Sequence, residues 1–403
     1  MYIVGLNAFH GDSSACLLKD GNLIGAAEEE RFRRIKHWAG FPSEALKWCL
    51  FEAGINLQDV DHIALNQDIK ANLGRKIMFT LDKRPSLKML IERFQNKRKR
   101  LSVKEHLLKA FPNSEFNGSI HSVEHHTAHL SSAFHTSPFD EAVTVSVDGF
   151  GDFASSAWGI GQGIKINLED RIYFPHSLGI FYQALTQFIG FHNYGDEYKV
   201  MGLAPYGKPV YIEQMREIVK LKSDGSFKLN LNYFRHHREK IDYEWENGSP
   251  HVGTLFSSNL ENLLGPERTK DQELTQKHKD IAHSVQAMYE EAFFHLLNKL
   301  YEKYNLDNLT IAGGCGMNSV ANGKVLIKTP FKKIYVQAAA GDAGGAVGAA
   351  LMTWYKIGGE KSKKRIISHN HAYWGPSFTN DYIGNLLKFE KDRIEKENCT
   401  IEV

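Results

Sequence analysis

Two stretches of the sequence repeat one order of strands and turns. Residues 2–30 (YIVGLNAFHGDSSACLLKDGNLIGAAEEE) indicate a strand, a Gly-Asp-Ser-Ser turn, a second strand, an Asp-Gly-Asn turn and a third strand. Residues 141–174 repeat that order around the Gly-rich turn DGFGDFASS. The similarity lies in the pattern rather than in the individual residues, as is common for internal duplications. We therefore expect a protein built from two similar halves.

Each half opens with a turn rich in Gly, Asp and Ser, and the second turn contains Gly149 and Gly151. Exposed backbone N–H groups in such turns form concavities that bind anions, and hydroxyl groups add further donors. Two such turns facing each other across a cleft would hold a polyphosphate or an acyl phosphate. We therefore expect an α/β fold with duplicated halves around a nucleotide cleft. This arrangement resembles the actin–hexokinase–Hsp70 superfamily, whose halves are ribonuclease H-like, and a resemblance of fold does not fix the chemistry.

The duplication sets the expected domain boundaries. We expect one domain over residues 1–360, with halves at about 1–138 and 139–360. Residues 208–270 lose the regular pattern and become polar with scattered aromatic residues, so we expect an insertion over the cleft or a lid there. Residues 272–304 carry apolar side chains at helical spacing and predict a long amphipathic helix.

Histidines and polar residues near the insertion have weaker signals. His236 and His237 lie in polar sequence, so we expect them to be exposed rather than to act as ligands. Asp196, Glu197 and Lys199 lie in the segment YGDEYKVMGLAPYG. They either contact a substrate or belong to a turn whose Gly and Pro residues matter for its conformation.

Near the end of the second half, two predicted strands run into Gly-rich turns, and the second turn opens a helix of small residues. The two sequences are LTIAGGCGMNS and KKIYVQAAAGDAGGAVGAA. Glycine lets the backbone approach a ligand closely. Two such turns in tandem indicate the adenosine side of a nucleotide pocket. The glycines expected to approach the ligand are Gly313, Gly314, Gly316, Gly341, Gly344 and Gly345.

Three histidines stand within five positions in the segment VEHHTAHLSSAF. The small and apolar residues around them are typical of a helix, on which His125 and His129 lie four apart and share a face. His126 points elsewhere, and we do not expect it to be a ligand. Two imidazoles at this spacing form half of a site for a first-row metal. The sequence is not HExxH, so it lacks the general base of that zinc-peptidase motif.

The remaining metal ligands should be carboxylates from nearby turns. Asp148 ends the predicted strand AVTVSVDG, and Asp342 lies in the turn AAAGDAGG, both where a strand reaches the expected cleft. Two histidines and two aspartates favour a divalent metal such as Fe(II) or Mn(II) over a thiolate-type zinc site. An open coordination position would polarise a phosphate or carbonyl oxygen. Spacing alone leaves histidines packed without a metal as the alternative.

Five motifs occur in one order: HHTAH, VDGFGD, FIGFHNYGDEYKVMGLAPYG, GGCGMNS and GDAGGA. Together they resemble the O-carbamoyltransferases of the nodulation and antibiotic type. The segments NAFHGDSSA and EEERFRRIKHWAGFPSEAL are similar to the N-terminal signature of that family, and the match runs to about residue 380. The resemblance implies an enzyme in which His125, His129, Asp148 and Asp342 hold the metal.

The resemblance also implies a reaction and its substrates. A carbamoyl group would pass from a carbamoyl adenylate, made from carbamoyl phosphate and ATP, to a hydroxyl of a sugar or natural product. The adenylate phosphate would lie near the metal, and its base near residues 313–318, including Asn318. His10 and Asp12 would contact the acceptor or the carbamoyl group, with His10 as a general base because a neutral imidazole accepts a proton near pH 7. For His10, a hydrogen bond that stabilises the turn is the alternative.

The end of the chain departs from the family pattern. In residues 361–403 the sequence HAYWGPSFTNDYIGNLLKF resembles the beginning of the family's second, adenylate-forming domain. We expect a truncated second domain here. The chain would then be a fragment, or a transfer module supplied by a separate adenylate-forming domain or protein. The expected partner in the reaction is a small-molecule or glycan hydroxyl acceptor.

Charge and composition exclude some classes of protein. The chain has 49 Lys and Arg against 47 Asp and Glu, a formal net charge of +2, which gives no global case for nucleic acid or anionic lipid. The basic end of SLKMLIERFQNKRKR is interpreted as a solvated helix face. The four cysteines are scattered, and the sequence has neither a signal-peptide pattern nor 18 consecutive apolar residues. We expect a cytoplasmic protein with no nucleic-acid partner and no membrane partner.

Two other functions stay open from the sequence. The first is an enzyme like the tRNA threonylcarbamoyl transferases, which share the fold and the histidine pair; the near-neutral charge argues against it. The second is a non-catalytic nucleotide-binding regulator. Retention of all four expected ligands disfavours the regulator.

Overall fold

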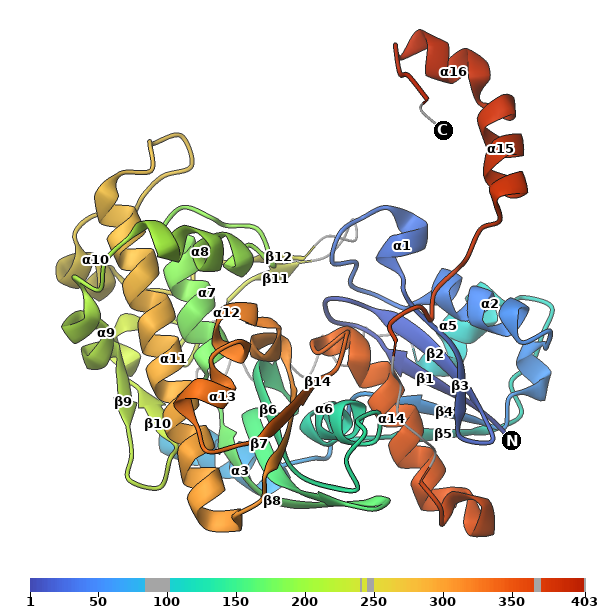
Figure 1. Cartoon of the computed structure of the whole chain (residues 1–403), viewed down its shortest axis with the longest axis horizontal. Coiled ribbons are helices and arrows are strands. Elements are labelled where there is room, and N and C mark those ends of the chain that lie inside the picture. Colours follow the sequence, from blue (N-terminus) through green and yellow to red (C-terminus); the bar gives the residue numbers. More distant parts are fainter. Residues whose placement is uncertain (84–101, 240, 245–249, 366–370, 402–403) are drawn as a thin grey trace.

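The computed structural model describes residues 1–83, 102–239, 241–244, 250–365 and 371–401. Two five-stranded mixed sheets stand side by side at its centre, and helices cover their faces (Figure 1). The basic run at residues 97–100 lies outside the described residues.

The two sheets have the same topology. The first contains β1 (Tyr2–Asn7), β2 (Ser14–Lys19), β3 (Asn22–Glu28), β4 (His62–Leu65) and β5 (Ser119–Ser122), in the order β3-β2-β1-β4-β5. The second contains β6 (Glu141–Gly151), β7 (Ala154–Gln162), β8 (Lys165–Tyr173), β13 (Asn308–Ala312) and β14 (Lys333–Val336), in the order β14-β13-β6-β7-β8. In each sheet an antiparallel meander is followed by two strands parallel to its first strand. The predicted duplication is confirmed.

Two helices cross between the halves. Helix α6 (His125–Phe134) ends the first half but packs on β6, β7 and β13 of the second sheet. Helix α14 (Asp342–Ile357) ends the second half but packs on β1, β2 and β4 of the first sheet. The two helices lie against each other between the sheets (Figure 1). A Cβ atom on Gly348 would overlap the carbonyl oxygen of Ala128, so only glycine permits this close approach.

The outer faces of the sheets are covered by other helices. Helices α2 (Ser43–Glu52) and α5 (Val103–Ala110) bury apolar residues with the first sheet. Helices α7 (Leu178–Phe188) and α11 (Gln276–Tyr304) do the same for the second sheet. Helix α11 is the predicted long amphipathic helix, and its apolar stripe is part of the largest core.

Most of the predicted insertion belongs to that same core. It contains α9 (Ile212–Ile218), β9 (Val219–Leu221), β10 (Phe227–Leu229), β11 (Tyr243–Glu244), β12 (His251–Val252) and α10 (Ser258–Leu264). Its apolar side chains pack with those of α7 and α11.

The prediction that His236 and His237 are exposed is wrong. They are 6% and 5% exposed. His236 stacks among Phe150, Phe174 and Phe234, and its Nε2 lies 2.9 Å from the carbonyl oxygen of Pro175. Burial lowers the pKa of His236 to about 4, so its ring is neutral near pH 7.

The C-terminal segment extends away from the two sheets. Trp374 accepts a hydrogen bond of 2.9 Å from the backbone of Ala26 on β3. Helices α15 (Asn380–Phe389) and α16 (Lys391–Lys396) then stand apart from the sheets (Figure 1) and contain no buried residue. The assignment of residues 361–403 to a second domain stays a prediction.

The remaining short helices connect these layers: α1 (Glu30–Arg33), α3 (Leu73–Lys83), α8 (Glu197–Leu203), α12 (Ser319–Asn322) and α13 (Val325–Lys328), with 3-10 turns at Leu57–Asp59, Ala204–Tyr206, Leu231–Tyr233, Gly314–Met317 and Gly359–Ser362. Among the described residues, the chain forms no helix of the length and apolar character needed to cross a membrane.

Candidate metal centre and cleft

Helix α6 places the two predicted histidine ligands at its buried start. Its cap residue Glu124 accepts a hydrogen bond of 2.8 Å from the backbone N–H of Thr127, which fixes where the helix begins. His125 and His129 follow on one face, a single turn apart, and are almost fully buried. The helix geometry therefore presents both imidazoles to the same point.

Four side chains converge at that point. The Nε2 atoms of His125 and His129 lie 3.0 Å apart. Asp148 Oδ2 lies 2.9 Å from His125 Nε2 and 3.3 Å from His129 Nε2. Asp342 Oδ1 lies 3.5 Å and 3.4 Å from the same two nitrogen atoms. One donor atom from each of the four residues lies within 4.8 Å of the others, so this group could bind a metal ion.

The electrostatics of this group favour a cation. Burial alone would lower the pKa of His129, but hydrogen bonds and charges from Asp148 and Asp342 raise it to about 10. Burial would raise the pKa of Asp148, but His125 and His129 hold it well below its usual range. Two carboxylates thus keep positive charge between them. A divalent metal supplies that charge in place of protons, and two imidazoles with two carboxylates suit a first-row metal.

Neighbouring groups orient three of these four residues. Asp148 lies near the end of β6, and its Oδ1 accepts a hydrogen bond of 2.9 Å from the backbone N–H of Gly314. Asp342 opens α14, and its Oδ2 lies 3.1 Å from His10 Nδ1. The backbone N–H of His125 donates to Asp152 Oδ2 at 2.9 Å. Contacts of this kind fix the orientation of metal ligands.

His126 is held outside the group. Its Nδ1 lies 2.9 Å from Ser146 Oγ, and the ring is fully buried. Burial is the largest of the causes that lower its pKa to about 4. This placement agrees with the expectation that His126 points away from the metal.

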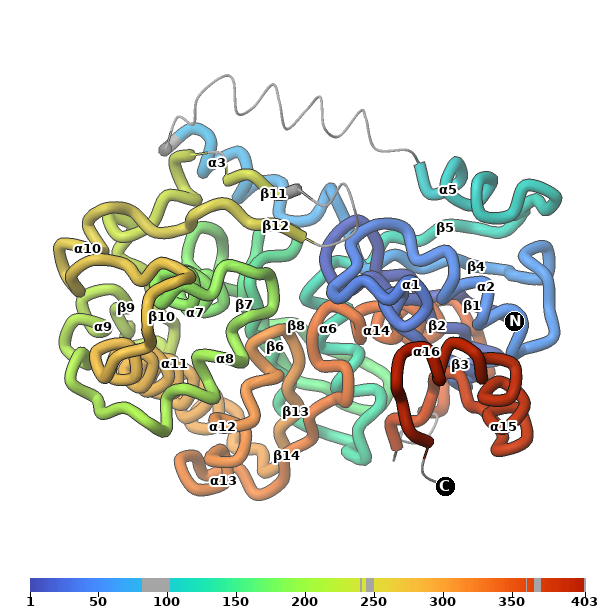
Figure 2. Tube along the Cα trace, turned by 90° about the horizontal axis from the view of Figure 1, so that it is seen from above, coloured from blue at the N-terminus to red at the C-terminus, as the bar shows by residue number. Residues whose placement is uncertain are grey.

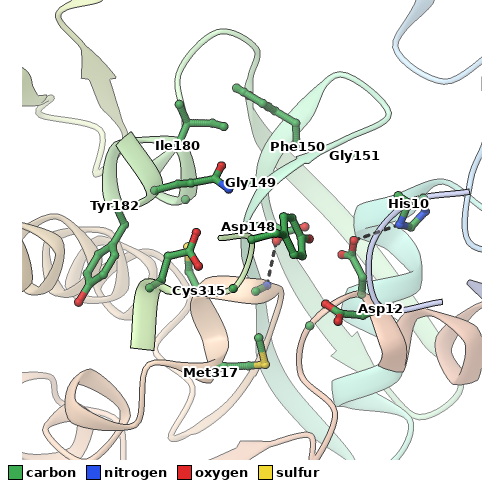
Figure 3. A pocket seen from close by; sticks show the side chains of 18 of the residues that line it. His10, Asp12, Asp148, Gly149, Phe150, Gly151, Ile180, Tyr182, Cys315 and Met317 are labelled. Carbon is green, nitrogen blue, oxygen red and sulfur yellow. Dashed lines mark hydrogen bonds and ion pairs between the residues drawn. The ribbon is translucent and has the colours of Figure 1, made fainter. Parts of the chain in front are cut away.

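A cavity of about 640 Å³ opens beside the metal group. Figure 3 shows His10 and Asp12 on one side of Asp148, with Tyr182 and Cys315 on the other. The predicted site residues that line the cavity are His10, Asp12, His125, Asp148, Gly149, Gly151, Gly314, Asn318, Gly341 and Asp342. The structure thus brings both halves of the duplication to one cavity.

Several of the glycines that were predicted to approach a ligand lie in tightly packed positions. A Cβ atom on Gly313 would overlap the carbonyl oxygen of Val147, and Gly313 has a φ angle of 89° that favours glycine. A Cβ atom on Gly344 or Gly345 would overlap Ala339 or Asn66. These three glycines, and Gly316, do not line the cavity. Their missing side chains permit close packing, and their approach to a ligand stays a prediction.

The segment near Asp196 divides between two roles. Asp196 is buried, pairs with Lys199 at 2.6 Å and accepts from Asn193, so it stabilises the turn. Neither Asp196 nor Lys199 lines the cavity, whereas Glu197 does. Burial is the main cause that raises the pKa of Glu197.

The sequence reasoning missed several residues of the cavity wall. His37 Nδ1 lies 2.7 Å from Asp12 Oδ1, and the backbone N–H of His37 donates to Glu30 at 2.6 Å. Tyr194 packs edge-on against His37, and Tyr243 of the predicted insertion reaches the same wall. The segment EEERFRRIKHW contains both Glu30 and His37, so it could have indicated these two residues from the sequence. Nothing in the local pattern indicates the two tyrosines.

The sequence model of the carbamoyltransferase N-terminus family matches residues 2–351. The chain belongs to this family. The resemblance read from the motifs is thereby confirmed.

The relatives include longer proteins. An uncharacterized protein of Synechocystis sp., sll1178, is 38% identical over 403 residues, which cover 96% of this chain and 62% of that protein. Nodulation protein NolNO of Sinorhizobium fredii is 32% identical over 395 residues, covering 98% of this chain and 53% of that protein. The chain thus spans between about half and two thirds of the length of these relatives. The crystal structure of T. kodakarensis HypF has a TM-score of 0.42 and 14% identity, over 91% of this chain and 49% of that chain.

Proposed function

We propose that the chain is the transfer module of an O-carbamoyltransferase that uses a divalent metal and a carbamoyl adenylate. The observation that carries the proposal is the convergence of two imidazoles and two carboxylates at the wall of a cavity of about 640 Å³. The family assignment supplies the reaction class. The size and lining of the cavity suit a nucleotide-bearing donor together with part of an acceptor.

The proposed metal ligands are His125, His129, Asp148 and Asp342, and Fe(II) or Mn(II) suits this donor set. When bound, such a metal supplies a Lewis acid for a phosphate or carbonyl oxygen. Gly149 lines the cavity, and a Cβ atom there would meet no other atom, so this position leaves room for the phosphate of the proposed donor. Gly151 also lines the cavity, and its missing Cβ atom makes room for the ring of His125.

His10 is the proposed general base. Its Nδ1 faces Asp342 Oδ2 at 3.1 Å, which orients the ring and leaves Nε2 as the nitrogen that receives a proton. In the proposed reaction the acceptor oxygen forms a bond to the carbamoyl carbon. The bond between that carbon and the phosphate oxygen breaks, and its electron pair leaves with AMP. The hydroxyl proton moves to His10 Nε2.

The proposal is tested by supplying carbamoyl adenylate directly to the metal-loaded chain with a panel of sugars and aminoglycosides. We expect a carbamate ester by mass spectrometry and one AMP for each ester formed. His10→Gln should lower the transfer rate by about a hundredfold or more while the metal content is retained.

The matched control is His251→Gln, because His251 is exposed on β12 and does not line the cavity. This variant should transfer at the wild-type rate. Wild-type transfer by His10→Gln would reject the base assignment. Release of AMP without any ester, over the whole panel of acceptors, would reject the transferase.

A further inference from the structure

Tyr194 reaches from the second half of the molecule to the turn that carries His10 and Asp12 in the first half. A Cβ atom on Gly11, between these two residues, would lie 2.7 Å from the hydroxyl oxygen of Tyr194. The phenol thus occupies the space beside the turn, and glycine at position 11 leaves room for it. Tyr194 also lines the cavity. Its hydroxyl group therefore lies next to the turn that holds the proposed general base.

Contacts on both sides fix the ring of Tyr194. It packs edge-on against His37 of the first half, with 5.4 Å between the ring centroids. The next residue, Gly195, has a φ angle of 83°, and a Cβ atom there would overlap His37 Nε2. On its other side the ring meets Tyr243 edge-on at 6.4 Å between centroids. Figure 2 shows β11, which contains Tyr243, on the side of the second half that faces α1. The hydroxyl of Tyr194 is therefore held in place by both halves.

Four other tyrosines line the cavity, and most of their hydroxyl groups are placed differently. The hydroxyl of Tyr182 donates to a side-chain oxygen at 2.8 Å, and that of Tyr289 donates to a backbone carbonyl oxygen at 2.9 Å. Tyr198 is 54% exposed. Tyr243 forms a hydrogen bond with Tyr194. Two phenols joined in this way share one O–H, so when Tyr243 donates, the O–H of Tyr194 is left for a further acceptor.

Both phenols of this pair stay protonated near pH 7. The charge of Tyr243, followed by burial and by the carboxylates of Asp12, Asp342 and Asp148, raises the pKa of Tyr194 well above its usual range. Burial, followed by the charge of Asp342, raises the pKa of Tyr243. The pair therefore supplies a neutral hydrogen-bond donor close to a group of carboxylates.

The cavity offers few other donors for a developing negative charge. Among the described residues that line it, Lys36 is the sole Lys or Arg, and its ammonium lies over the ring of the exposed Tyr198. Five residues of the lining carry carboxylates, which only accept hydrogen bonds when they are ionised. These residues are Asp12, Asp148, Asp152, Glu197 and Asp342. Acyl transfer places negative charge on the oxygen of the carbonyl group under attack, and that charge needs a donor.

We propose that the hydroxyl of Tyr194 donates a hydrogen bond to the carbamoyl oxygen during transfer, so that Tyr194 is a further catalytic residue. This inference rests on the proposed function. As the attacking oxygen bonds to the carbamoyl carbon, an electron pair of the C=O bond moves onto the carbamoyl oxygen. When that pair returns, the bond from carbon to the phosphate oxygen breaks, and its electrons leave with AMP. The proton of the attacking hydroxyl moves to His10, and Tyr194 keeps its own proton throughout.

Binding of the acceptor is the alternative role for Tyr194, and water as the attacking group separates the two roles. The carbamoyl oxygen becomes negative whether water or an acceptor attacks, so a donor to that oxygen assists both reactions. A donor that only binds the acceptor leaves hydrolysis of carbamoyl adenylate unchanged and alters the KM for the acceptor.

The test compares the wild type with Tyr194→Phe, which keeps the ring and loses only the hydroxyl. Both proteins are loaded with Mn(II), and AMP release from carbamoyl adenylate above the rate in buffer is measured with water alone and with a carbamoylated acceptor from the panel. Tyr194→Phe should lower kcat by about a hundredfold or more in both reactions. The KM for the acceptor, the metal content and the melting temperature should stay at their wild-type values.

Tyr206→Phe is the matched control, because Tyr206 is 70% exposed and does not line the cavity. It should release AMP at the wild-type rate in both reactions.

The outcomes separate this inference from the proposed function. Wild-type kcat in Tyr194→Phe overturns the inference and leaves the proposed function standing. Unchanged hydrolysis with a raised KM for the acceptor assigns Tyr194 to acceptor binding and also overturns it. So does a loss of metal whose replacement restores the rate, because the hydroxyl is then structural. No AMP release by the wild type above the rate in buffer rejects the proposed function, and the inference with it.

Discussion

Two groups of histidine and carboxylate side chains border the same cavity, and they differ in how their charges are satisfied. In one, Asp12 and Glu30 each face a hydrogen-bond donor of His37, at 2.7 Å and 2.6 Å. In the other, His125 and His129 turn their Nε2 atoms toward each other at 3.0 Å, with two carboxylates around them.

The difference shows how a metal site can be distinguished from an ion pair. Where each acceptor meets a donor, the group is complete by itself. Where several ligand atoms converge on one point with only protons between them, a metal cation can replace those protons and bind all of the ligand atoms. Both groups could hold a metal ion by the spacing of their ligand atoms. We propose the group on α6 and α14 as the metal site, because four donor atoms converge there, whereas Asp12 and Glu30 each already accept a hydrogen bond from His37.

The largest expected effect breaks the converging group. His129→Ala removes one ligand and should lower the amount of bound metal by more than about tenfold. Loss of a residue that only hydrogen-bonds to a metal ligand already lowers metal affinity by about that factor. Elemental analysis of the purified variant measures it. His126→Asn is the control on the same helix and should keep its metal. Wild-type metal content in His129→Ala would remove the basis of the comparison.

A second change acts on the distance between the two helices. Gly348→Ala places a methyl group against the carbonyl oxygen of Ala128, and overpacking of this kind costs about 1–3 kcal/mol. We expect a lower melting temperature by calorimetry and weaker metal binding, since α6 and α14 each carry ligands. Gly202→Ala on α8 is the control, because a Cβ atom there meets open space. Equal melting temperatures for both variants would contradict the close packing.

A third change tests the paired group. Asp12→Asn removes the charge that faces His37 but leaves the four converging ligands intact. Metal content should remain at the wild-type level, while transfer from carbamoyl adenylate falls by about tenfold as the cavity wall loses its pair. Loss of metal in Asp12→Asn would mean that the two groups act as one.

The smallest effect concerns pH. Burial lowers the pKa of His37, but the hydrogen bond and charge of Asp12 more than offset this, so its folded pKa is raised. The folded state then binds the proton more tightly, and the pair stabilises the fold below the unfolded pKa of about 6.5. This contribution disappears as the pH rises through the folded pKa. Because the side chains are partly exposed, it should stay under about 1 kcal/mol.

The measurement is the melting temperature of the wild type and His37→Gln at about pH 6 and about pH 9. At the lower pH the wild type should melt at a higher temperature than His37→Gln. This difference in melting temperature between the two proteins should shrink at the higher pH. A difference in melting temperature that grows with rising pH would contradict the expectation that the His37–Asp12 pair stabilises the fold mainly at low pH.

Much of the fold could be predicted from the sequence, because alternating apolar residues and Gly-Asp turns define strands locally. The convergence of Asp148 with the histidine pair was predictable for a related reason. Strand ends meet at one edge of a sheet, and helical spacing of four brings two side chains onto one face. Asp342 followed from the same argument.

Other features depend on contacts between distant segments. His236 lies in a polar stretch, yet aromatic rings from β6 and from the turn after β8 enclose it. Gly344 and Gly345 read as ligand contacts, yet Ala339 and Asn66 fill the space beside them. The exposure of Leu73 and Ile77 on α3 also could not be predicted from the sequence. An amphipathic pattern does not specify which face of a helix packs on the rest of the molecule.

The crossing of α6 and α14 has a consequence for biosynthesis. His125 and His129 leave the ribosome more than two hundred residues before Asp342. Asp342 reaches them only after α14 has crossed back onto the sheet formed by the first strands of the chain. A growing chain therefore cannot assemble the four ligands until almost all of the described fold has been synthesised. Capture of a metal ion by these four residues would thus be a late event, and a chain that held one would already have closed both halves.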